Sequence, residues 1–134
     1  MIKSLYIFLL SFGALVYTAC NNNSTTVVQT NQINTNSPPR KPYNPTPHDS
    51  LTEPAGTHIT FLWSGGDPDA GDTARYDLYL DTSNPPVNSL IQGTPATVYD
   101  LGIPGPGVYF WQVIAKDKSG AATNGPVWRF TISP

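Results

Sequence analysis

The stretch VYFWQVIA, residues 108–115, decides the fold class of this chain. Apolar side chains occupy every second position: Tyr109, Trp111, Val113 and Ala115. A period of two, built largely from aromatic and β-branched residues, predicts a β-strand that buries one face. The other phase contains Phe110, Gln112 and Ile114, which we therefore expect on the opposite side of the same strand.

The same alternation recurs along the C-terminal two-thirds of the chain. It appears in THITFLW (57–63), RYDLYL (75–80) and PVWRFTI (126–132). Weaker strands fit residues 49–53, 88–91 and 96–101, and loops rich in Gly, Pro, Asp and Asn separate all of them. Seven short strands without a helical segment predict an all-β, immunoglobulin-like sandwich of two sheets.

Several positions in these strands resemble a known family. They are Trp63, Tyr76-x-Leu78, Leu101 with Tyr109, Trp111-x-Val113-x-Ala115, and GPVWRFT at 125–131. On these residues, 48–134 resemble a fibronectin type III domain of the kind common in bacterial surface proteins. The resemblance implies a tyrosine corner, in which the Tyr109 hydroxyl bonds to nearby backbone. The spacing from Leu101 to Tyr109 is two residues longer than usual, and GIPGPG fills it.

Composition excludes some classes of function. Only 12% of residues are charged, and no basic run appears, so we expect no nucleic-acid partner. Fourteen prolines and a low charge are typical of an extracytoplasmic β-domain with a loose segment. Because the chain has one cysteine, it forms no internal disulfide and no Cys-based metal site, and we expect no cofactor.

Residues 1–19 have the organisation of a signal peptide. Lys3 precedes an apolar core, Leu5–Val16, which is too short to span a bilayer, since that takes about 20 residues. The small residues Thr18 and Ala19 follow, and then Cys20.

The junction Tyr17-Thr18-Ala19-Cys20 resembles a bacterial lipobox, although Tyr17 stands where an aliphatic residue is usual. The resemblance implies that Cys20 carries a diacylglyceryl group and anchors the mature protein in a membrane. Asn21, where an Asp would mark inner-membrane retention, points to the outer membrane of the cell envelope, without deciding the leaflet. The alternative is an ordinary secretory signal followed by an incidental cysteine.

Residues 20–47 are expected to form a lipidated cysteine and a disordered tether. Asn, Thr, Ser and Gln dominate after Cys20, and Ser37–Pro47 contains five prolines. Such residues bury too little apolar surface to offset the entropy lost on ordering. We therefore place the start of the folded domain at His48. A second interpretation treats Pro39-Arg40-Lys41-Pro42 as a proline-rich ligand.

The chain offers little for catalysis, and we expect a protein that is not an enzyme. It has one Glu and two His, all near the start of the domain, and no matched carboxylate pair for glycoside hydrolysis. Asp67, Asp69 and Asp72 in GGDPDAGD are a weak candidate for a hard-cation site. The spacing fails the usual calcium-loop pattern, which favours a polar turn instead.

A possible ligand face follows from the strand phases. In the fibronectin type III arrangement, the strands at 75–80, 108–115 and 126–132 are neighbours in one sheet. The outward residues on them are Tyr79, Phe110, Gln112, Ile114 and Arg129. We expect a binding or adaptor module for a protein or glycan of the cell envelope. The alternatives are a structural spacer or accessory subunit without a ligand, and a face that the protein's own chain or cross-strand packing occupies.

Overall fold

The computed structural model describes residues 8–10, 14–16 and 35–134. The chain divides into two compact units, Met1–Thr35 and Asn36–Pro134. In the first, β1 (Phe8–Leu10) and β2 (Ala14–Val16) pair antiparallel, within the stretch expected as the core of the signal peptide. Cys20, the expected lipidation site, lies outside the described residues.

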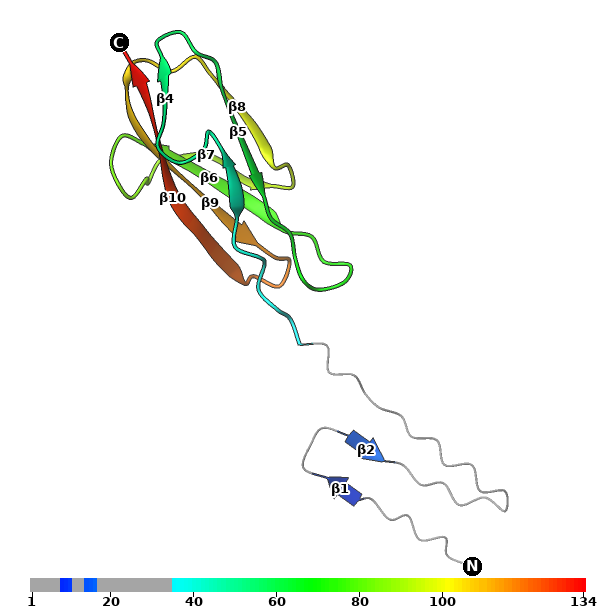
Figure 1. Cartoon of the computed structure of the whole chain (residues 1–134). Coiled ribbons are helices and arrows are strands. Elements are labelled where there is room, and N and C mark those ends of the chain that lie inside the picture. Colours follow the sequence, from blue (N-terminus) through cyan, green and yellow to red (C-terminus); the bar gives the residue numbers. More distant parts are fainter. Residues whose placement is uncertain (1–7, 11–13, 17–34) are drawn as a thin grey trace, which may run out of the picture. The chain divides into compact units, whose positions relative to one another are not determined.

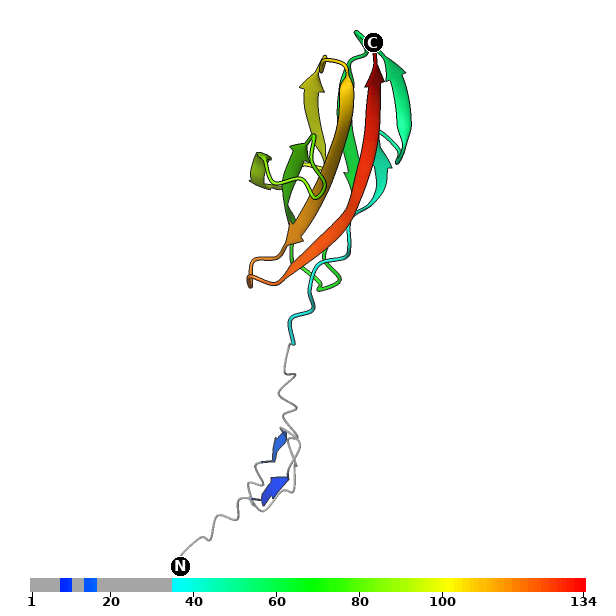
Figure 2. The ribbon, with the colours of Figure 1, turned by 90° about the vertical axis from the view of Figure 1, so that its left-hand side faces the viewer.

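The second unit is built from strands. They are β3 (Tyr43–Thr46), β4 (Leu51–Pro54), β5 (Ile59–Ser64), β6 (Arg75–Asp81), β7 (Ser89–Thr94), β8 (Val98–Gly102), β9 (Gly107–Lys116) and β10 (Ala122–Ser133). Figure 1 shows them as two layers, and Figure 2 shows the long β9 and β10 side by side. Within residues 35–134 there is no helix.

Two sheets form the sandwich. One has five strands in the order β4-β10-β9-β6-β7, and the other has three in the order β3-β5-β8. The pairs are antiparallel except β4 with β10, which run parallel. This confirms the expected all-β two-sheet sandwich. All seven expected strands are present, and β3 is an eighth.

The start of the domain differs from the expectation. The compact unit begins at Asn36 rather than His48, and β3 pairs antiparallel with β5, with Thr46 opposite Leu62. Pro39, Pro42 and Pro47 are buried. The prediction of a disordered tether was therefore wrong for residues 36–47. A proline ring still buries apolar surface, and an edge strand tolerates the missing N–H donor.

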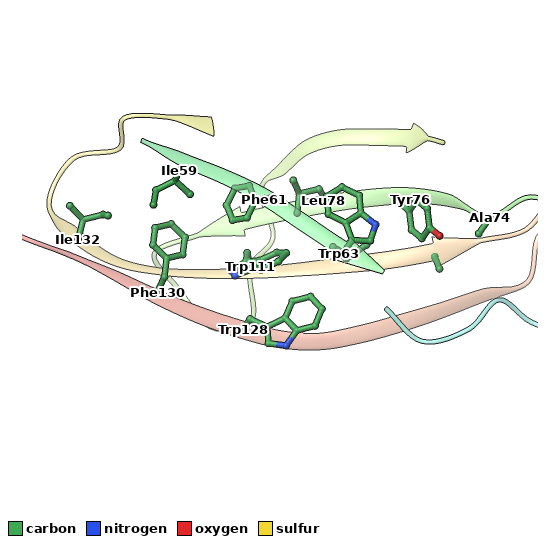
Figure 3. Packing of buried hydrophobic residues seen from close by; sticks show 12 residues of the cluster. Ile59, Phe61, Trp63, Ala74, Tyr76, Leu78, Trp111, Trp128, Phe130 and Ile132 are labelled. Carbon is green, nitrogen blue, oxygen red and sulfur yellow. The ribbon is translucent and has the colours of Figure 1, made fainter. Parts of the chain in front are cut away.

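The core lies between the sheets and is rich in aromatic residues. Its buried members are Ile59, Phe61, Trp63, Ala74, Tyr76, Leu78, Trp111, Val113, Ala115, Trp128, Phe130 and Ile132. All of them except Ala74 belong to the apolar phases that the sequence indicated. The ring of Trp111 lies 4.7 Å from that of Phe61 and 4.6 Å from that of Trp128, centroid to centroid (Figure 3). Trp111 thus joins the two layers.

The tyrosine corner is present. The Tyr109 hydroxyl donates to the carbonyl of Gly105 at 2.9 Å, and the ring stacks on Phe130 with centroids 5.1 Å apart. The bond was expected from the family resemblance and is confirmed by this contact. The longer connection before Tyr109 is accommodated by Gly102, whose φ of +84° allows β8 to turn sharply into the loop.

Candidate binding face

The outer face of the five-stranded sheet contains the residues expected to bind a ligand. Gln112 of β9 pairs with Tyr79 of β6 on one side and with Val127 of β10 on the other. Paired residues of antiparallel strands lie on the same face. Phe110 and Ile114 flank Gln112 two positions away along β9, so they share that face. Apolar side chains therefore surround Gln112. We call the group of Tyr79, Phe110, Gln112, Ile114 and Val127 the Gln112 face.

Arg129 lies at the rim of the Gln112 face. It pairs with Phe110, and Phe110 pairs on its other side with Asp81. The Arg129 side chain is exposed, and one guanidinium nitrogen lies 3.5 Å from the hydroxyl of Ser50. The Asp81 carboxylate accepts hydrogen bonds from Thr82 and other groups of its own loop. The backbone hydrogen bond from Ser83 and its neighbours lowers the Asp81 pKa.

The central residues of the Gln112 face are half-buried. This holds for Tyr79, Phe110, Gln112 and Ile114. Cross-strand packing covers the lower part of each side chain and leaves the upper part in contact with solvent. The Gln112 amide donates to the carbonyl of Gly125 at 2.7 Å, which holds its side chain toward β10. Contacts with the sheet therefore hold the side chains of the Gln112 face in place.

Asp77 is in the same outward phase of β6 as Tyr79, but its side chain is buried. It is 1% exposed, and its carboxylate accepts the Gly93 N–H at 2.8 Å and a hydrogen bond from Lys116. That hydrogen bond, together with the charge of Asp77, raises the Lys116 pKa. The register of the β6–β7 pair shifts around Asp77, and the resulting β-bulge at Gly93 brings the Gly93 N–H to the Asp77 carboxylate. A glycine inside a strand often marks a bulge, so Gly93 is the sequence feature that could have indicated it.

The carboxylates of the acidic loop accept hydrogen bonds from backbone groups of the loop and of Ser37. The Asp67 carboxylate accepts the Asp69 N–H at 2.8 Å, and that of Asp69 accepts the Ser37 N–H at 2.6 Å. Asp72 accepts the Thr73 N–H and lies 3.6 Å from the Lys118 ammonium group. In the part of the chain that the structure describes, no group of three or more His, Cys, Asp or Glu side chains is placed to hold a metal ion.

The histidines lie at the surface. The Nε2 of His58 is 3.2 Å from a carboxylate oxygen of Asp100, and the two side chains are 55% and 66% exposed. His48 contacts the carbonyl of Asp49 through Nδ1, also in solvent. Exposure of this degree is typical of surface pairs, which contribute little to stability.

The three-stranded sheet carries an exposed apolar group that was not expected from the sequence. On the outer face of the three-stranded sheet, Leu62 pairs with Val98, and Tyr43 lies on the adjacent strand. These three side chains are 44%, 49% and 50% exposed, respectively. The outward phase of THITFLW contains Leu62, but Tyr43 lies in the stretch that was expected to be the tether.

Across residues 8–10, 14–16 and 35–134, no helix is long and apolar enough to cross a membrane.

Comparisons with known proteins give a structural likeness but no match in sequence. No protein-family model matches the chain, and no curated protein matches it. Among solved structures, an α-L-rhamnosidase of Streptomyces avermitilis in complex with L-rhamnose is similar over 72% of this chain, with 15% identity and a TM-score of 0.48. The chain covers 10% of that much longer enzyme.

Proposed function

We propose that this protein is a non-catalytic lipoprotein of the bacterial cell envelope, anchored through Cys20, whose fibronectin type III-like domain is a binding or adaptor module. The apolar core before Thr18-Ala19-Cys20 supports the anchor. The domain assignment is supported by the tyrosine corner and by the arrangement of β6, β9 and β10 as neighbours in one sheet. The absence of Asp after Cys20 supports the outer membrane.

The observation that carries the binding role is the Gln112 face. Large apolar side chains surround one amide, and a cationic side chain, Arg129, lies at the edge. An apolar centre with a polar rim is the usual organisation of a protein interface, and aromatic and Arg side chains often contribute most of the binding energy. The partner we propose is a protein or glycan of the cell envelope.

A structural role is the second candidate. In this case the domain is a spacer or an accessory subunit of an envelope complex and has no ligand of its own. The half-burial of Tyr79, Phe110 and Ile114 favours it, because such packing stabilises a sheet without any partner.

The two roles differ in a pull-down from membranes with the lipidated protein as bait. The binding role predicts that a Tyr79→Ser, Phe110→Ser variant loses partners that the unchanged protein retains. Leu62→Ser, on the other sheet, is the matched control and should retain them. Both variants must keep a cooperative thermal transition, so that unfolding does not explain the loss. If the double variant keeps every partner, the Gln112 face is not the binding surface.

The anchor is tested separately. Cys20→Ala should move the protein from the membrane to the soluble fraction and abolish labelling with a fatty-acid analogue. A variant that stays in the membrane fraction to the same extent contradicts the lipid anchor.

A further inference from the structure

We propose that Asn36–Pro42 is a strap, held in a clamp formed by the β5–β6 loop (65–74) and the β9–β10 loop (117–121), and that it fixes the end of the domain from which the chain leaves. The strap and the clamp rest on contacts within the domain.

One carboxylate from each loop binds the beginning of the strap. The side-chain amide of Asn36 donates to the carboxylate of Asp117 at 2.7 Å, and the Ser37 N–H donates to that of Asp69 at 2.6 Å. Hydrogen bonds to a charged acceptor are stronger than those between neutral groups. The strap is therefore bound by two loops that lie far apart in the sequence.

Backbone groups continue the contact toward β3. The Arg40 N–H donates to the carbonyl of Gly66 at 2.9 Å, and the Thr123 hydroxyl donates to the carbonyl of Pro39 at 2.7 Å. Gly66 belongs to one loop of the clamp, and Thr123 follows the other at the start of β10. The strap is thus bound from both sides along its length.

The strap also packs into the domain. Pro39 and Pro42 are buried. A Cβ atom built on Gly125 would lie 2.6 Å from the carbonyl oxygen of Val113 and 3.3 Å from the Cβ of Pro42. The missing side chain of Gly125 therefore makes room for the strap against β10.

The clamp is organised by its own contacts. Asp117 is 7% exposed, and its second carboxylate oxygen accepts the Ala121 N–H at 2.8 Å. Asp72 of one loop and Lys118 of the other approach to 3.6 Å, and the Asp72 side chain is 4% exposed. This ion pair joins the two loops. The acidic residues that resembled a cation site serve to position a segment of the protein's own chain.

The strap determines where the chain leaves the folded domain. It enters at the end of the sandwich where β9 turns into β10, and Pro134 lies at the opposite end (Figures 1 and 2). If the domain began at His48, the chain would leave beside β4 and β10 instead.

Limited trypsin digestion tests the strap on the mature protein in detergent. Between Cys20 and Arg75, the Arg40–Lys41 bond is the site trypsin can cut, since Pro42 follows Lys41. A docked strap protects this bond. Asp69→Ala, Asp117→Ala should increase its cleavage rate at least tenfold, whereas Asp100→Ala, an exposed carboxylate on the other sheet, should leave it unchanged. Equal rates in the unchanged protein and the double variant overturn the strap, as does cleavage of the unchanged protein as fast as a free peptide of residues 35–46.

Discussion

Replacing Gly125 by Ala tests the packing of β10 against β9 and the strap with a single methyl group. The backbone of Gly125 is not in the positive-φ region, so alanine meets no conformational barrier there. The obstacle is space. The new Cβ would lie 2.6 Å from the Val113 carbonyl oxygen, a rigid atom of the neighbouring strand.

Two effects of opposite sign determine the change in the free energy of unfolding. Overpacking a dense site costs about 1–3 kcal/mol, because the backbone or its neighbours must shift. Replacing glycine by alanine stabilises the protein by about 0.4–1 kcal/mol, because it reduces the conformational entropy of the unfolded chain. The contact with Val113 is backbone against backbone and has little freedom to relax, so we expect a net destabilisation of about 1–2 kcal/mol. For a domain of this size, that lowers the melting temperature by roughly 4–15 °C.

Urea and thermal denaturation of the mature protein, followed by tryptophan fluorescence, measure the effect. Gly105→Ala is the matched control, since its Cβ has nothing within 4 Å and its φ is not positive. The control should keep or slightly raise the stability. If Gly125→Ala is as stable as Gly105→Ala, the close approach of β10, Val113 and the strap is not as described.

Four further outcomes are expected. Trp63→Ala should cost about 3–5 kcal/mol in denaturation, and a loss below 1 kcal/mol would contradict its place in the core. Tyr109→Phe should cost about 1 kcal/mol, the worth of its backbone hydrogen bond, and an unchanged urea midpoint would refute that value. The Asn36 amide lowers the Asp117 pKa, so its stabilising effect is present above the unfolded carboxyl pKa of about 3.9 and is lost as the pH falls through the lower folded value. The melting temperature should therefore fall below about pH 4, less steeply in Asp117→Asn, and identical profiles would argue against this contact. Millimolar calcium should leave the melting temperature unchanged, whereas a rise of many degrees that Asp69→Ala abolishes would restore the metal site.

The strands and their buried faces could be predicted from the sequence. Alternation in the stretches around Phe61, Leu78, Trp111 and Phe130 is a local property, because successive side chains of any strand point to opposite sides. The same rule, together with the strand order that the family resemblance implies, predicted that Tyr79, Phe110, Gln112 and Ile114 share one outer face. The use of that face by a ligand stays a prediction.

The domain boundary could not be predicted from composition. Residues 36–47 contain polar residues and prolines, which as a class argue for disorder. The structure shows three of these prolines buried and Tyr43–Thr46 paired with β5. A segment with little apolar surface of its own becomes ordered where the rest of the domain supplies the partner surface, and composition does not report that surface.

The period of each strand and most of the core could thus be predicted from alternation along the chain, because these depend on neighbouring residues. The tyrosine corner was expected from the family resemblance. The roles of the carboxylates depend instead on tertiary contacts. Asp77 is buried where it accepts the Gly93 N–H of β7, and Asp117 accepts the side-chain amide of Asn36, which lies 81 residues away in the sequence. Strand pairing across the whole domain determines which loops lie together at one end of the sandwich. Only loops that lie together can supply hydrogen-bond partners for each other's polar side chains.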